Sequence, residues 1–345
     1  MKLAFAAKVL TTVAALLLSA VPAQASLPGI EDYTNERIVP LLITPTSARS
    51  DGSGFLYSSR IVFTSAHTAV TFNQKGELVD FREELSVGKP NSNVQTSGPG
   101  VRVIKRFASP GYTANKEGDT HDFAILVLEK ELMKVEPAQL MTPEIEKELV
   151  EKRATVKMHG YGLHVDLCAA NEKPPCRSKP FESSLVPRSS EATLRPASDF
   201  AQLIPNPLQP RFTNELLFFS PEKTGMCAGD SGGSLTTTYN GKLLYLSNIG
   251  TGGNTYGCGL GGGYDGKGGF QHSPQIYKQS DLIKQAEKFL AEQIVIEEAT
   301  AKAKAEAKAK TLPATKKITI TCVKGKTTKK VTAANPKCPT GYKKK

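Results

Sequence analysis

The chain has 345 residues, of which 39% are hydrophobic and 22% are charged. This composition excludes a chain that is disordered throughout and suits about two ordinary domains. After the first twenty residues no apolar run is long enough to cross a membrane, which excludes a multi-pass membrane protein. The net charge of +11 comes from residues 301–345, which hold 14 Lys and one acidic residue, whereas the other 30 basic and 32 acidic residues nearly cancel.

The N-terminus has the layout of a secretory signal peptide. Two lysines accompany the apolar stretch Val9–Ala20, and an Ala-x-Ala cleavage site ends at Ala25. We therefore expect residues 1–25 to be removed, which leaves a secreted chain without a transmembrane anchor. An uncleaved membrane anchor is the alternative, but the apolar stretch is short and the cleavage site is well formed.

Short apolar runs separated by turn residues predict two sets of β-strands, over about residues 30–150 and 154–279. The predicted strands are Ile38–Ile43, Gly54–Tyr57, Arg60–Thr64, Val101–Ile104, Phe123–Leu128, Thr155–Met158, Glu215–Phe219, Gly233–Leu235 and Leu243–Asn248. Many short strands joined by Gly-rich turns are typical of sandwiches or barrels. We therefore expect two β-units of similar size.

Outside these sets the pattern changes twice. Residues 163–211 are rich in Pro and Ser and lack periodicity, which predicts long surface loops. A helix is predicted over residues 281–300, with Ser280 or Asp281 as its N-cap. Its apolar face should pack on the second β-unit and consists of Ile283, Ala286, Phe289, Leu290 and Ile294. An Ala- and Lys-rich helical spacer should then continue until Pro313 stops it.

Six cysteines are candidates for disulfides, because export places them in an oxidising compartment. Proximity in the sequence favours the pairs Cys168–Cys176, Cys227–Cys258 and Cys322–Cys338. Zinc binding is the alternative, but the chain has no Cys-x-x-Cys or Cys-x-x-His pair. We therefore expect no metal and no other cofactor.

The segment Cys227–Ser234 places Ser231 among three glycines and beside an aspartate. Such glycines allow a tight turn whose backbone N–H groups converge on one spot, as stabilisation of an oxyanion requires. A serine nucleophile also needs a base, usually His, and a carboxylate that orients it. His67 follows a predicted strand, and His121 and Asp122 precede another. A plain Gly/Ser loop is the alternative interpretation of the serine segment by itself.

Four segments resemble, in the same order, motifs of the chymotrypsin/trypsin-like serine protease family: Thr64–His67, Asp122–Leu126, Gly160–Gly162 and Gly229–Gly233. The resemblance covers about residues 30–295. It is specific, because unrelated proteins that use a catalytic triad of Ser, His and Asp have these three residues in another order along the chain. It implies an all-β fold of two six-stranded antiparallel β-barrels, at about 30–150 and 154–279, with the helix and the basic tail after them.

The resemblance also implies roles for individual residues. Ser231 would be the nucleophile, His67 the general base and then acid, and Asp122 the carboxylate that holds the imidazole. The backbone N–H groups of Gly229 and Ser231 would form the oxyanion hole. Cys227–Cys258 matches the family's disulfide beside the specificity pocket. The implied reaction is hydrolysis of peptide bonds through an acyl-enzyme.

Some positions depart from the family pattern. Thr68 follows the expected base where a cysteine is usual. By the resemblance, Gly225 would occupy the floor of the specificity pocket, where trypsins have Asp, so an uncharged P1 residue is expected. Gly252 lies in the strand beside the pocket, and the Gly-rich loop after it carries Asp265, which could still bring a carboxylate to the pocket.

Many family members are activated by a new N-terminus that pairs with the aspartate before the nucleophile, here Asp230. Ile30, after Gly29, and Ile38, after Arg37, are both candidates. We favour Ile30, because Ile38 fits better as the first residue of a barrel strand.

Residues 301–345 resemble the Cys-containing, Lys-rich ends of other secreted bacterial proteins. A solvated extension is one interpretation, and retention at an anionic cell-surface polymer is the other. Nucleic-acid binding is not expected, because Tyr342 is the only aromatic residue of this tail.

The sequence therefore predicts a secreted bacterial serine endopeptidase that acts on a protein or peptide substrate. It has a signal peptide (1–25), a protease domain (26–300) and a basic tail (301–345). The main alternative is a non-catalytic binding protein on a protease scaffold, although such proteins usually lose a triad member or the oxyanion glycine. An esterase with the same triad is disfavoured by the chain order of the three residues.

Overall fold

The computed structural model describes residues 30–72, 78–80, 84–112, 121–162, 183–200, 214–221, 229–250, 269–311 and 316–345. These residues fall into two compact units, which divide between Glu287 and Lys288. The predicted signal peptide lies outside the described residues. Within them, no helix is both long enough and apolar enough to cross a membrane.

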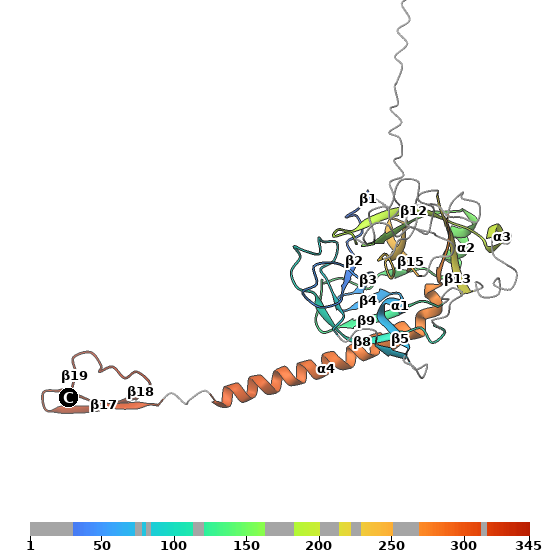
Figure 1. The fold of residues 1–345 in the computed structure, drawn as a ribbon. Coiled ribbons are helices and arrows are strands. Elements are labelled where there is room, and N and C mark those ends of the chain that lie inside the picture. The colour runs from blue at the N-terminus through green and yellow to red at the C-terminus, as the bar shows by residue number, and fades with distance from the viewer. Residues whose placement is uncertain are drawn as a thin grey trace, which may run out of the picture. The chain divides into compact units, whose positions relative to one another are not determined.

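The first unit contains a closed barrel of six strands in the order β2-β3-β4-β9-β8-β7 (Figure 1). Val39, Leu56, Val62 and Leu126 are fully buried in one cluster of this barrel. In order around the barrel, the strands are Ile38–Leu42, Gly52–Ser58, Ile61–Thr64, Ala124–Leu128, Val101–Ala108 and Ser86–Val87. After β4 come the one-turn helix α1 and a short hairpin, with bounds Ala66–Ala69 (α1), Val70–Phe72 (β5) and Leu78–Asp80 (β6). The predicted first barrel is therefore confirmed.

The second sheet has the order β10-β15-β14-β11-β12-β13-β16, with β1 also paired to β12. Over the described residues it is a half-barrel, so the expectation of two closed barrels is confirmed only for the first. All of its pairs are antiparallel except β10 with β15. The bounds are Ile30–Glu31 (β1), Gln139–Leu140 (β10), Thr155–Gly160 (β11), Arg188–Leu194 (β12), Glu215–Ser220 (β13), Ser234–Tyr239 (β14), Lys242–Asn248 (β15) and Gly269–Pro274 (β16).

The loop prediction for residues 163–211 is wrong where β12 and the short helix α3 (Ala197–Phe200) form. β12 pairs with β11 on one side and with β13 on the other, so it is an internal strand. Its sequence lacks the apolar alternation typical of strands. Ser189 is nevertheless buried, because its hydroxyl donates to the buried Asp32 carboxylate at 2.6 Å. A hydrogen-bonded serine thus takes an inward position that the pattern assigns to solvent.

The C-terminal helix α4 runs from Ser280 to Thr311, after a 3₁₀ turn at Ile276–Gln279. It therefore includes the predicted Ala- and Lys-rich spacer and ends before Pro313, as expected. Leu282, Ile283 and Ala286 are buried, whereas Ile294 is 38% exposed. The apolar face therefore ends earlier along the helix than the sequence pattern predicts.

A hydrogen bond joins α4 to the first barrel, and the predicted packing of its apolar face on the second β-unit stays a prediction. The Tyr57 hydroxyl of β3 donates to Glu287 at 3.0 Å. Burial, together with the charge of Glu287, raises the pKa of Tyr57 to about 12, which keeps this hydroxyl protonated as the donor. Just before α4, Gln275 Nε2 donates to Glu146 of helix α2 (Pro143–Glu151) at 2.7 Å.

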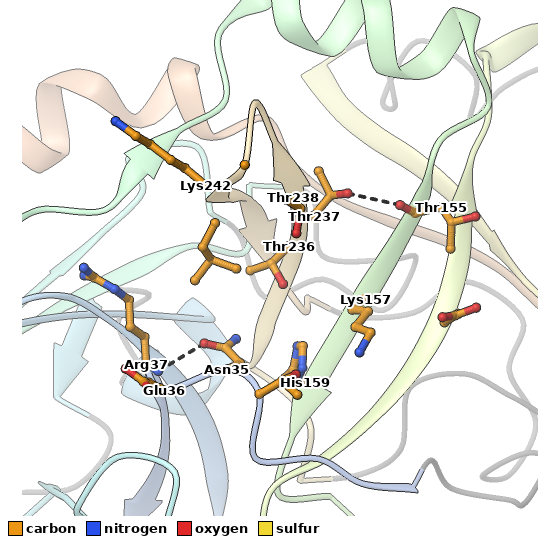
Figure 2. Close-up of a pocket in the computed structure, with 14 residues that line it drawn as sticks. Asn35, Glu36, Arg37, Thr155, Lys157, His159, Thr236, Thr237, Thr238 and Lys242 are labelled. Carbon is orange, nitrogen blue, oxygen red and sulfur yellow. Dashed lines mark hydrogen bonds between the residues drawn. The ribbon is translucent and has the colours of Figure 1, made fainter.

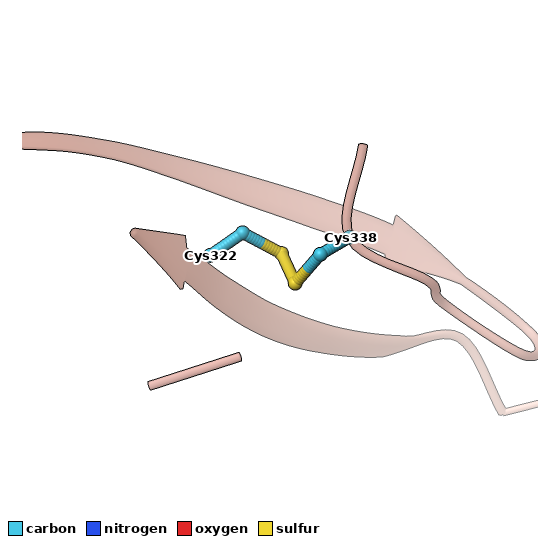
Figure 3. The surroundings of a disulfide bond; sticks show 2 residues. All are labelled: Cys322 and Cys338. Atoms are coloured by element: carbon cyan, nitrogen blue, oxygen red, sulfur yellow. A yellow bond between two sulfur atoms is a disulfide. The ribbon is translucent and has the colours of Figure 1, made fainter. Parts of the chain in front are cut away.

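The second unit ends in a small antiparallel sheet in the order β18-β17-β19. Its strands are Ile318–Lys324 (β17), Thr327–Ala333 (β18) and Lys343–Lys344 (β19). The predicted disulfide Cys322–Cys338 is present, with the two Cα atoms 5.6 Å apart (Figure 3). Cys322 and Ile320 are its buried apolar residues, so the disulfide forms much of the interior of this sheet.

The N-terminal segment is anchored to the second sheet by Asp32, which lies just after β1. Its Oδ2 is 3.2 Å from Lys157 Nζ and 3.3 Å from His159 Nε2, both on β11. Burial raises the pKa of Asp32, but hydrogen bonds from Ser189 and Thr34 outweigh burial and hold this pKa well below its usual range. The charge of Asp32 therefore persists at all ordinary pH values.

His159 is 2% exposed. It lines a pocket of about 720 Å³ between the N-terminal segment at residues 34–37, β11 and β14 (Figure 2). The contact of Nε2 with Asp32 lacks hydrogen-bond geometry, so neither ring nitrogen has a hydrogen-bond partner among the described residues. Burial lowers the pKa of His159 to about 4, although the nearby charge of Asp32 acts in the opposite direction. The folded protein therefore holds this imidazole in its neutral form.

We expect His159 to make the free energy of unfolding rise with pH between about 4 and 6.5. The unfolded chain binds a proton on this residue in that range and the folded chain does not. The slope should reach at most about 1.4 kcal/mol per pH unit. Urea unfolding at several pH values, with His159→Gln as the comparison, measures this contribution. Equal slopes for the two proteins would contradict it.

Candidate active site

His67 lies in α1, directly after β4, at the edge of the first barrel. Its Nδ1 is 2.6 Å from Asp122 Oδ2, and its backbone N–H donates to Asp122 Oδ1 at 2.9 Å. The Asp122 side chain has no exposed surface, whereas the His67 side chain is 31% exposed. The ring therefore reaches solvent on one side and a buried carboxylate on the other.

Strand pairing explains why two residues so far apart in the sequence meet. β4 and β9 are neighbours in the barrel, with Thr64 opposite Ala124. His67 follows the end of β4 and Asp122 precedes β9, so both lie at the same end of this strand pair. The second sheet also reaches this point, because Asn248 Nδ2 of β15 donates to the backbone carbonyl of Asp122 at 2.8 Å. The sequence analysis did not identify Asn248, since nothing in its neighbourhood marks it.

The segment that carries Ser231 leads into β14 and packs against the first barrel. The backbone carbonyl of Ser231 accepts from Ser53 N–H at 2.8 Å, and the Ser53 hydroxyl donates to the Gly229 carbonyl at 2.8 Å. Gly229 and Gly232 have φ of +94° and +83°, a region that favours glycine. A Cβ on Gly232 would overlap Thr64 Oγ1 and Ser53 O, next to the turn that holds His67.

Asp230 is held against the motif Gly160–Gly162 rather than in open solvent. The N–H of Gly162 donates to Asp230 Oδ1 at 2.7 Å. A Cβ on either Gly160 or Gly162 would overlap the Asp230 side chain, so both positions need glycine. The two motifs identified in the sequence are therefore in direct contact.

The structure gives different environments to the two candidate activation residues. Ile38 begins β2, its side chain is fully buried, and its N–H donates to the Asn35 carbonyl at 3.3 Å. Ile30 is 62% exposed and lies in β1 at the edge of the second sheet. Cleavage before Ile38 would therefore require disruption of a barrel strand, as the sequence analysis assumed. Use of Ile30 stays a prediction.

The remaining predicted site residues lie outside the described residues. They are the specificity-pocket positions Gly225, Gly252 and Asp265 and the disulfide candidates Cys168, Cys176, Cys227 and Cys258. The uncharged P1 preference inferred from Gly225 therefore stays a prediction.

The described geometry supports proton transfer at one defined atom. A buried carboxylate that accepts from His67 Nδ1–H leaves Nε2 as the acceptor nitrogen of the neutral ring. A base fixed in this tautomer can take a proton from a hydroxyl within reach of Nε2. The glycine turn at Ser231 is the local structure in which backbone N–H groups can converge on an oxyanion.

Substitution of Gly232 tests how tightly this turn is packed. Gly241→Ala is the matched control, because Gly241 also has a positive φ (+75°) but nothing lies within 4 Å of a Cβ there. Gly241→Ala should lower the free energy of unfolding by about 1 kcal/mol. Gly232→Ala should lower it by roughly a further 1–3 kcal/mol because of steric overlap. Equal losses in denaturant titrations would show that the turn accommodates a side chain.

Comparison with known proteins agrees with this architecture. No curated protein matches the chain. A family model described as Trypsin matches residues 44–271, which include His67, Asp122, Ser231 and most of the two sheets. This match covers more than half of the chain, and the chain therefore belongs to the trypsin family.

Proposed function

We propose that this chain is a secreted serine endopeptidase that uses Ser231, His67 and Asp122. The observation that carries the proposal is the double contact between His67 and the fully buried Asp122 carboxylate. A surface histidine gains little from such an arrangement, and a buried charge is costly unless it is paired. Membership of the trypsin family supports a protein or peptide substrate.

In the proposed mechanism, Ser231 Oγ attacks the carbonyl carbon of the scissile bond while His67 Nε2 takes the hydroxyl proton. The N–H groups of Gly229 and Ser231 stabilise the resulting oxyanion. His67 then passes its proton to the leaving amine, which yields an acyl-enzyme. Water, activated by the same histidine, hydrolyses this ester and restores Ser231.

A non-catalytic binding protein on the same scaffold remains the alternative to test. Nothing specific in the site favours it, since all three triad residues and Gly229 are present. Reaction with a fluorophosphonate, which modifies only an activated serine, separates the two functions.

Ser231→Ala should lower kcat by about 10⁶-fold with the fold intact, because the triad acts as one unit. It should also abolish fluorophosphonate labelling. Hydrolysis of a peptide library measures the first effect and mass spectrometry of the labelled chain the second. Ser234→Ala is the matched control, three residues along, and should retain both activities. Peptidase activity that persists in Ser231→Ala would contradict the assignment.

The C-terminal sheet supports a second part of the proposal, retention at an anionic cell-surface polymer. All ten lysines between residues 316 and 345 are exposed. Lys329 on β18 and Lys344 on β19 lie opposite Cys322 on its two sides, so they extend one cross-strand row. Lys329 Nζ also lies 5.3 Å from the Tyr342 ring centroid. Like charges so arranged repel, and an anionic polymer would relieve this repulsion.

Truncation after Thr300 should leave peptide hydrolysis within about twofold and weaken binding to isolated cell envelopes. Binding of the full chain to envelopes should also weaken as salt increases, because the Debye screening length falls from about 10 Å at 0.1 M to about 3 Å at 1 M. Sedimentation with envelopes at low and high salt measures the binding.

A full-length variant with Lys324, Lys329, Lys330, Lys343 and Lys344 changed to Gln separates charge from chain length. Because it keeps nine of the fourteen lysines of residues 301–345, it should bind less well than the full chain but better than the truncated chain. If either variant sediments as well as the full chain at both salt concentrations, the retention proposal is wrong.

A further inference from the structure

A buried carboxylate of the second sheet reaches the segment that carries Asp122. Glu215 is the first residue of β13, and its side chain has no exposed surface. Its Oε1 accepts from the backbone N–H of His121 at 3.1 Å. Its Oε2 lies 3.3 Å from Nδ1 of His272, a buried residue of the neighbouring strand β16.

Stability alone does not explain a carboxylate at this position. The rest of β13 is apolar apart from its last residue, and a well-packed apolar side chain in place of a buried ion pair is often neutral or stabilising. The presence of a buried carboxylate here is therefore better explained by its role as a fixed hydrogen-bond acceptor than by a gain in stability. One oxygen of this carboxylate faces His272, and the other accepts from the backbone N–H of His121, the residue before Asp122.

The backbone at His121 needs such support. His121 has φ of +61°, which few residues other than glycine adopt. Its carbonyl accepts from Phe123 N–H at 2.7 Å, so a tight turn surrounds Asp122. The imidazole of His121 packs on Gly111, where a Cβ would come within 2.8 Å of His121 Cγ. The direction of the Asp122 side chain depends on this turn.

Two side chains of the second sheet thus hold the backbone on both sides of the Asp122 side chain. Glu215 accepts from the N–H of His121, and Asn248 donates to the carbonyl of Asp122. We infer that Glu215 is a positioning residue, which keeps His121 in its left-handed conformation and so aims the Asp122 carboxylate at His67. This inference rests on the proposed function, because it assigns Glu215 a part in aligning the same triad.

Three variants separate the hydrogen bond from the charge. Glu215→Gln keeps an acceptor oxygen at the same reach and should retain kcat within about threefold. Glu215→Leu removes the acceptor, and kcat should fall roughly 10–100-fold with KM nearly unchanged, since misplacement by about 1 Å can cost 10²-fold. Glu215→Asp keeps the charge but is one methylene shorter, and it should resemble the Leu variant. It also serves if the Leu variant fails to fold.

Glu146→Leu is the matched control, because Glu146 is a half-buried carboxylate that pairs with Gln275 and not with the His121 turn. Its kcat should be unchanged. A general effect of removing a carboxylate on the first unit would lower kcat in this variant as well.

The position of the carboxylate is also measured without turnover, from the ¹H NMR signal of His67 Nδ1–H in the Ser231→Ala background. This signal should move upfield or broaden in Glu215→Leu and Glu215→Asp and stay in place in Glu215→Gln. If the native chain hydrolyses no peptide, the proposed function is wrong. The His67 Nδ1–H signal would still test whether Glu215 positions the Asp122 carboxylate. Unchanged kcat and an unchanged signal in Glu215→Leu or Glu215→Asp would overturn the inference, as would an equal loss of kcat in Glu215→Gln.

Discussion

The carboxylate of Asp122 has no exposed surface, and the surrounding structure must supply every group that stabilises its charge. The first barrel supplies the ring and the backbone N–H of His67. The second sheet contacts the backbone on either side of this carboxylate instead, through Asn248 and Glu215. An unpaired buried charge costs several kcal/mol. The two sheets therefore dock against each other around this group, and the site and the tertiary fold depend on the same contacts.

The segment that carries Ser231 is subject to a related constraint of space. It leads into β14 of the second sheet, but its glycines pack on the first barrel, against β3 and the turn between β4 and α1. Gly232 faces Thr64 and Ser53 so closely that no side chain fits. On the other side, Asp230 fills the space left by two further glycines of β11 and the turn after it. Glycine in this motif thus serves packing as much as backbone conformation.

The sequence predicted those structural elements that depend on patterns within a short stretch of the chain. Most strands of the first β-unit and the C-terminal disulfide follow from apolar runs and cysteine spacing, whereas the barrel and the contact of His67 with Asp122 follow from the family resemblance. β12 was missed because its inward Ser189 is buried through a hydrogen bond to Asp32, a partner more than 150 residues away in the chain. Glu215 was missed for the same reason, since it begins an apolar strand and its acceptor role exists only once the sheets meet.

The C-terminal sheet has very little apolar interior, and this gives its covalent link a wider consequence. The disulfide closes a segment with a sequence separation of 16, and a loop of that size removes about 3 kcal/mol of conformational freedom from the unfolded chain. Domains this small seldom fold without such a link. The ordered array of lysines is thus conditional on the redox state of its surroundings. In a reducing compartment we expect the same residues to form an extended polycation with no fixed spacing between charges.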